Sequence, residues 1–108
     1  MGTGLKMDIP PSLEGQIRTK SGIAHKHGVF VLNSPGTIDP DYRGEVKVLL
    51  QNAGDQPYFV KAGQKIAQLV ICPRTICWPR LNPIPFVEVD SISDATPRGT
   101  GGFGSTGV

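Results

Sequence analysis

Short segments in which apolar and polar residues alternate recur along this chain, and glycine or proline interrupts each of them. Period-two alternation occurs at residues 5–9, 46–50 and 86–89, and continuous apolar runs of strand length occupy residues 28–33 and 67–72. Alternation of this kind is typical of half-buried strands, and short apolar runs bounded by turn residues are typical of buried ones. The sequence therefore predicts an all-β sandwich or barrel built from short strands.

Two other segments differ from this pattern. Residues 21–28 (SGIAHKHG) are the one place where a helix is expected, and it would be about two turns long. Residues 91–108 are rich in glycine and poor in apolar residues, which is typical of a flexible terminal arm. We therefore expect one β domain over residues 1–90 and a flexible arm over residues 91–108.

Composition narrows the classes of function. The 108 residues carry a formal net charge of +2 with 19% charged residues, so the chain lacks the basic excess of a nucleic-acid binder. Its apolar runs are too short to span a bilayer, and no membrane association is expected. Cys72 and Cys77 lack further cysteines that would complete a metal site. We interpret them as ordinary buried thiols of a reducing compartment, which predicts a cytoplasmic location, with nuclear or organellar ones also compatible.

The glycine-rich end has two opposite interpretations. Gly99, Gly101 and Gly104 satisfy the spacing G-x-G-x-x-G, but too few residues follow Gly104 for the helix that a dinucleotide fingerprint opens. Composition alone also fits a disordered terminus. The presence of Arg98, which suits phosphate, and Phe103, which suits a planar ring, instead favours a lid that closes over a nucleotide.

Four segments occur in a characteristic order: SGIAHKHG, NSPGTIDPDYRGEVKVLLQN, AGQKIAQLV and RGTGGFGSTG. Together they resemble the second to fifth motifs of the trimeric deoxyuridine triphosphatase (dUTPase) family. The resemblance implies a jelly-roll or distorted β-barrel subunit and a homotrimer with shared active sites. It also implies hydrolysis of dUTP at the α-phosphate to dUMP and pyrophosphate, which limits uracil incorporation into DNA and supplies dUMP for dTMP synthesis. Mg²⁺ would be held by the triphosphate and water, with no direct protein ligand.

Asp39 is the candidate catalytic residue. It lies in a tight turn rich in glycine and proline that can aim a carboxylate into a cleft, where it could act as a base on water. On the residues alone, a purely structural role in the turn is also open, and Asp41 is the better candidate for that role. The resemblance implies that Asp39 orients and deprotonates the water that attacks the α-phosphate.

The resemblance also implies a set of substrate-binding residues. Tyr42 would lie under the deoxyribose and leave no space for a 2′-hydroxyl, Arg98 would bind the γ-phosphate, and Phe103 would stack on the uracil. The other members would hold the uracil, the sugar or the phosphate chain: Asn33, Gly36, Thr37 and Ile38 in the uracil pocket, Lys47 near the base or sugar, Lys20, Ser21, Gly22 and Gln68 at the phosphates, and Gly102, Gly104 and Ser105 in the closing arm.

The chain departs from the family pattern in two places. The family's first motif, which usually contains an aspartate, would lie upstream of Met1, so we expect the early strands to be missing. Lys20 stands where the second motif usually has arginine, and lysine keeps the charge but loses the planar fork. Three alternatives remain open: a non-catalytic dUTP-binding or protein-interaction relative, a dCTP deaminase, and a β-sandwich adaptor that binds no nucleotide. Tyr42 argues against the deaminase.

Overall fold

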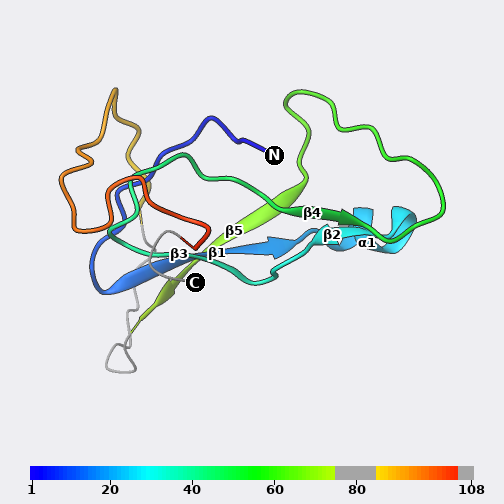
Figure 1. The fold of residues 1–108 in the computed structure, drawn as a ribbon, viewed down its shortest axis with the longest axis horizontal. Coiled ribbons are helices and arrows are strands. Elements are labelled where there is room, and N and C mark those ends of the chain that lie inside the picture. The colour runs from blue at the N-terminus through cyan, green and yellow to red at the C-terminus, as the bar shows by residue number, and fades with distance from the viewer. Residues whose placement is uncertain (75–84, 105–108) are drawn as a thin grey trace.

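The computed structural model describes residues 1–74 and 85–104 of the chain. Its elements in chain order are β1 (Leu13–Thr19), α1 (Ser21–His27), β2 (Val29–Val31), β3 (Gly36–Ile38), β4 (Leu50–Asn52) and β5 (Ala67–Pro73). The strands form two antiparallel sheets, one in the order β3–β1–β5 and one that pairs β2 with β4 (Figure 1). The chain is therefore mostly β with one short helix, as predicted, although the described residues form no closed barrel.

The strand β1 is the centre of the larger sheet, and sequence patterning did not predict it. Its buried side carries Leu13, Gly15 and Ile17. Gly15 interrupts the apolar alternation in the sequence, because a buried position of the strand is occupied by a residue without a side chain. A Cβ atom at that position would lie 3.2 Å from both the Cβ of Ile38 and the Cδ1 of Leu69. The glycine therefore allows side chains of both neighbouring strands to close over the middle of β1.

The helix α1 confirms the prediction for residues 21–28. It ends at His27, and the following Gly28 adopts the left-handed conformation with φ of 68° and donates its backbone N–H to the carbonyls of Ile23 and Ala24. This is a common glycine C-cap, and the basic side chains in the last turn suit the negative end of the helix dipole. The helix lies next to β2 and β4 at one end of the molecule, opposite the C-terminal segment (Figure 1).

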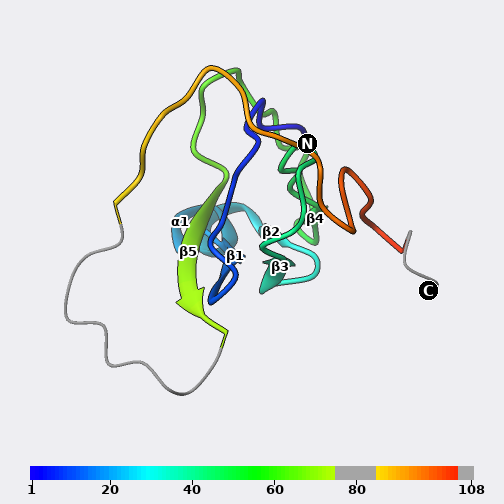
Figure 2. The same ribbon diagram turned by 90° about the vertical axis from the view of Figure 1, so that its left-hand side faces the viewer.

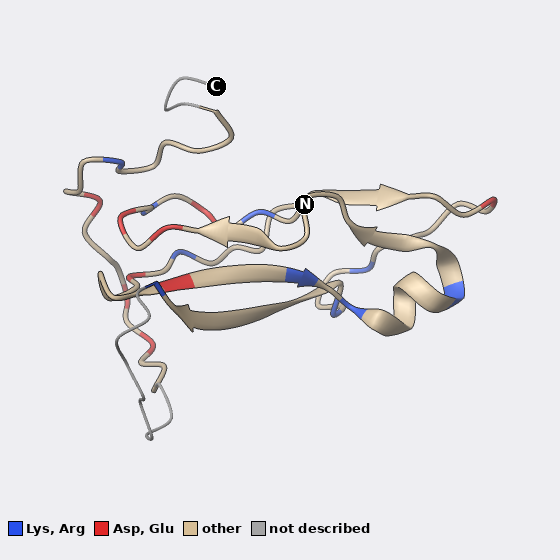
Figure 3. Cartoon of the chain, turned by 90° about the horizontal axis from the view of Figure 1, so that it is seen from below, with Lys and Arg blue, Asp and Glu red and all other residues tan. Residues whose placement is uncertain are grey.

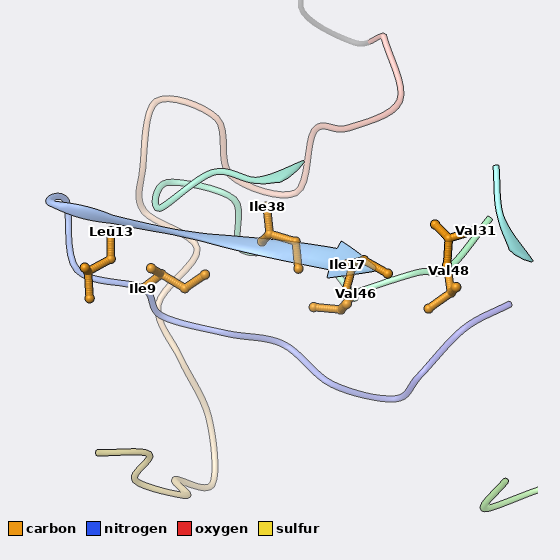
Figure 4. Packing of buried hydrophobic residues seen from close by; sticks show 7 residues of the cluster. All are labelled: Ile9, Leu13, Ile17, Val31, Ile38, Val46 and Val48. Carbon is orange, nitrogen blue, oxygen red and sulfur yellow. The ribbon is translucent and has the colours of Figure 1, made fainter. Parts of the chain in front are cut away.

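The hydrophobic core lies along one side of β1. Its seven buried members form a row (Figure 4): Ile9, Leu13, Ile17, Val31, Ile38, Val46 and Val48. The N-terminal segment closes this row through backbone hydrogen bonds from Val46 to Leu5 (2.7 Å) and from Val48 to Met1 (2.8 Å). Ile17, Ile38 and Val46 also line the pocket described below, so the core forms part of that pocket's wall.

The apolar segments predicted from the sequence have different outcomes. The run at residues 28–33 contains β2, and the run at 67–72 lies within β5, which confirms both. The alternation at 46–50 correctly predicts burial of Val46 and Val48, whereas at 5–9 Ile9 is buried and Leu5 is exposed. β4 begins only at Leu50, and the rest of these segments is not in a named strand. Alternation reports which side of a segment is buried, whereas a strand also needs a continuous ladder of hydrogen bonds with a neighbour.

The strand predicted at residues 86–89 is wrong. This segment contains no strand, and the side chains of Phe86, Val87 and Val89 are 70%, 79% and 57% exposed. The apolar pattern predicts a strand, yet among residues 1–74 and 85–104 no strand pairs with this segment. Cys72 is a half-buried free thiol, while Cys77 lies outside the described residues.

Candidate functional site

The turn that follows β3 carries the predicted base. The backbone N–H of Tyr42 donates to the carbonyl of Asp39 at 3.1 Å, which closes the turn. The side chain of Asp39 is 39% exposed and forms an ion pair with Arg98. The carboxylate is therefore held at the surface of the turn, accessible to solvent and in contact with a cation from the C-terminal segment.

The C-terminal segment is fixed to this turn by hydrogen bonds. Arg43 donates its backbone N–H to the carbonyl of Gly99 at 2.6 Å, and the hydroxyl of Thr96 donates to the carbonyl of Asp41. In Figure 2 this segment (gold to red) crosses over the N-terminal segment and descends on the side of β3. In this structure of a single chain, the arm thus lies on the Asp39 turn of its own chain.

The ring of Tyr42 is held between the turn and the arm. Its hydroxyl donates to the carbonyl of Glu45 at 2.7 Å, and the guanidinium carbon of Arg98 lies 5.5 Å from the ring centre. The same guanidinium group donates from Nε to the carbonyl of Gly101 at 2.8 Å. Arg98 therefore joins three groups: the candidate base, the aromatic ring and the glycine-rich backbone of the arm.

These residues surround one pocket of about 180 Å³. It brings together ten of the residues predicted from the sequence: Asn33, Gly36, Thr37, Ile38, Asp39, Tyr42, Lys47, Arg98, Gly102 and Phe103. The side-chain amide of Asn33 lies so close to Gly36 that a Cβ there would be 3.2 Å from its Nδ2. The pocket combines apolar walls with a few convergent polar groups, which is the usual character of a small-molecule site.

The other predicted residues lie elsewhere. Lys20, Ser21, Gly22 and Gln68 do not line this pocket. Lys20 is the N-cap residue of α1, and the side-chain amide of Gln68 donates to the carbonyl of Thr19 at 3.2 Å, so these residues gather where β1 meets α1. Gly104 lies next to the lining residue Phe103, and Ser105 lies outside the described residues.

A larger and more polar cleft of about 740 Å³ adjoins the pocket. Asp39 and Arg98 line both hollows, so their ion pair lies at the boundary between them. Acidic and basic residues lie close together in the loops at this end of the molecule (Figure 3). A ligand with its apolar ring in the pocket and a charged extension in the cleft would therefore lie next to this ion pair.

Arg43 is a site residue that sequence reasoning missed. It is only 9% exposed, and its guanidinium group donates to the carbonyl of Pro40 and to Asp8 Oδ1 at 2.9 Å. With its backbone N–H bonded to Gly99, Arg43 ties the Asp39 turn to both the N-terminal segment and the arm. Its position between Tyr42 and Gly44 in the motif was the available signal, but the sequence does not reveal which groups a buried guanidinium contacts.

Replacing Arg43 with leucine is expected to lower the free energy of unfolding by roughly 2–4 kcal/mol, because charge-assisted hydrogen bonds to the turn and to Asp8 are lost. Asp8→Asn is the matched control. Asp8 is 61% exposed, so its removal should cost less than about 1 kcal/mol. Urea unfolding of the two variants measures both values. Similar small losses in both would contradict the role assigned to Arg43.

Residues 1–74 and 85–104 contain no group of three or more His, Cys, Asp or Glu side chains placed to hold a metal ion. In the same residues, no helix has the length and apolar character needed to cross a membrane.

The fold and the pocket define a small β protein with a mixed apolar and charged ligand site. The dUTPase family model matches residues 1–107, and the chain belongs to this family. It is similar to the deoxyuridine 5′-triphosphate nucleotidohydrolases of Methylocella silvestris and Mesorhizobium japonicum, with 56% and 53% identity over 106 residues. These matches cover 98% of this chain but 61% of each relative, so the chain spans about three fifths of their length.

A solved structure supports the same fold. The structure of Staphylococcus bacteriophage 80alpha dUTPase with dUPNHPP matches with a TM-score of 0.53 and 28% sequence identity. The match covers 95% of this chain and 72% of that chain. The jelly-roll type of fold implied by the sequence motifs therefore agrees with the structural neighbours.

Proposed function

We propose that this chain is a dUTP diphosphatase that uses Asp39 as its catalytic base. The observation that carries the proposal is that Asp39, Tyr42 and Arg98 meet at one pocket, which is also lined by Asn33, by β3 and by Phe103 of the arm. The named relatives, which are deoxyuridine 5′-triphosphate nucleotidohydrolases, support the choice of substrate.

The pocket would hold the uracil and the deoxyribose. Backbone groups of residues 36–38 and the amide of Asn33 would bind the polar edge of the uracil, and Phe103 would stack on the base. A site that hydrogen-bonds one base edge leaves buried groups unpaired when another base enters, so cytosine is disfavoured. Tyr42 would lie under the sugar and exclude a 2′-hydroxyl.

Asp39 would then act on the attacking water. The carboxylate accepts a proton from water as the water oxygen bonds to the α-phosphorus, and the bond from that phosphorus to the leaving pyrophosphate oxygen breaks. Arg98 pairs with Asp39 in the free chain. In the complex, the guanidinium would move to the γ-phosphate, where it forms a planar fork with two oxygens. This exchange would free the carboxylate when a triphosphate is in place.

Mg²⁺ is part of the proposal. Mg²⁺ prefers octahedral oxygen ligands and commonly binds substrate phosphates with several waters retained. The triphosphate and water would supply the ligands of the ion, and the solvent-accessible carboxylate of Asp39 would remain available as the base. When bound, the ion would neutralise charge on the phosphates.

We further propose that the chain acts as a homotrimer with shared sites. Lys20, Ser21, Gly22 and Gln68 do not line the pocket of their own chain, and a neighbouring subunit that supplies this phosphate-binding group accounts for the separation. Light scattering with and without dUTP tests this part, and three times the mass of one chain is expected. A monomer under both conditions would contradict it.

A second candidate is a non-catalytic dUTP-binding relative. The same separation favours it, because the pocket of one chain contains the base and sugar residues without the phosphate-binding group. The assay is pyrophosphate release from dUTP with Mg²⁺. The proposed enzyme turns over well above an Asp39→Asn control, whereas the binding protein retains affinity without release. The cytoplasmic location and the division into residues 1–90 and 91–108 stay predictions.

A further inference from the structure

Gly44 is buried directly against the ring of Tyr42. A Cβ atom built on Gly44 would lie 2.6 Å from Tyr42 Cζ and 2.8 Å from Cε1, and it would also overlap the hydroxyl oxygen. Contacts under 3.0 Å are essentially never seen for real Cβ atoms. The ring therefore occupies the space that any side chain at position 44 would need.

The backbone does not explain the glycine. Gly28 and Gly99 have φ values of 68° and 56°, where a glycine is favoured because it has no Cβ. Gly44 is not among the glycines with positive φ, so an alanine could adopt its backbone conformation. The space taken by the Tyr42 ring is thus the feature that requires glycine at this position.

The ring is also confined on its other sides. Its hydroxyl donates to the carbonyl of Glu45 at 2.7 Å, and the guanidinium carbon of Arg98 lies 5.5 Å from its centre. A Cβ on Gly102 of the arm would lie 3.3 Å from Tyr42 Cε1. A ring displaced by a methyl group at position 44 would therefore lose its hydrogen bond or press against the arm.

We propose that Gly44 is a specificity-determining position, because it lets the Tyr42 ring fold back onto the Glu45 carbonyl and so fixes the surface that faces the sugar. This proposal rests on the proposed dUTP site. Gly44 does not line the pocket and would act through Tyr42, so it is a positioning residue for the choice between deoxyribose and ribose.

The test compares dUTP and UTP as substrates of the wild-type protein and of Gly44→Ala. The ratio of kcat/KM for dUTP to that for UTP is expected to fall by about tenfold or more. This is the lower end of the discrimination that one group in a binding pocket usually provides. Titration with dUMP and UMP measures the same preference without hydrolysis. A ratio that stays within about twofold of wild type in these measurements would overturn the proposal.

A double-mutant cycle with Tyr42→Ala isolates the contact from a general effect on folding. With Tyr42 present, Gly44→Ala should lower Tm by roughly 4–8 °C, as expected for modest overpacking in a small domain. With Tyr42→Ala, it should lower Tm by less than about 2 °C. An equal loss in both backgrounds would overturn the proposal. If wild type hydrolyses no dUTP, the proposed function fails, while the cycle and the dUMP titration still decide the role of Gly44.

Discussion

Asp39→Asn is expected to lower kcat for dUTP hydrolysis by about 10²–10⁴-fold, the usual contribution of a positioned general base. Asparagine keeps the size of the side chain but cannot accept the proton from the attacking water. Because the pocket walls are unchanged, KM for dUTP should remain within a few fold of wild type. Steady-state measurement of pyrophosphate release gives both constants.

Asp41→Asn is the matched control for this substitution. Asp41 lies two residues further along the same turn and lines the adjoining cleft instead of the pocket. Its variant should retain most of the wild-type kcat. Comparable losses in the two variants would mean that the turn needs negative charge in general, and the assignment of Asp39 as the base would fail.

Arg98→Gln should lower kcat/KM for dUTP by about 100-fold, because two charge-assisted hydrogen bonds to the γ-phosphate are lost. Arg98→Lys should fall between this variant and wild type, since lysine keeps the charge without the planar fork. The ion pair with Asp39 is partly exposed, with side-chain exposures of 22% and 39%. Its loss should therefore change the free energy of unfolding by less than about 1 kcal/mol.

The nucleotide provides the control for Arg98. dUDP lacks the γ-phosphate, so its affinity should be nearly the same for wild type and Arg98→Gln, whereas that of a non-hydrolysable dUTP analogue should fall. Calorimetric titration of both nucleotides measures the two affinities. Equal losses for dUDP and the triphosphate would indicate that Arg98 mainly supports the arm or the Tyr42 ring instead of binding the terminal phosphate.

Much of the candidate pocket could be predicted from the sequence because many of its residues lie close together along the chain. Asn33, Gly36 and Tyr42 lie within ten residues of one another in a segment rich in turn residues, so a motif describes their arrangement well. Arg98 and Phe103 were identified by residue type in a segment that cannot form a regular element. The structure places both beside the turn, which local patterns alone do not reveal.

The residues that the sequence did not reveal depend on contacts between distant segments. Gly15 conceals the central strand, because its function is to leave space for Ile38 and Leu69 from two other strands. Arg43 and Gly44 belong to the recognised motif, yet their roles depend on Asp8 and on the folded-back Tyr42 ring. At residues 86–89 the apolar pattern is present, but no strand in the described part of the chain pairs with this segment.

Hydrolysis of dUTP in ¹⁸O-labelled water with Mg²⁺ tests the central claim most directly. Attack on the α-phosphorus with Asp39 as the base predicts equal amounts of dUMP and pyrophosphate, with the label in dUMP and turnover far above the Asp39→Asn control. Label in the pyrophosphate would place the attack at another phosphorus atom. Turnover no higher than that of the control would contradict the assignment of this chain as a dUTP diphosphatase that uses Asp39.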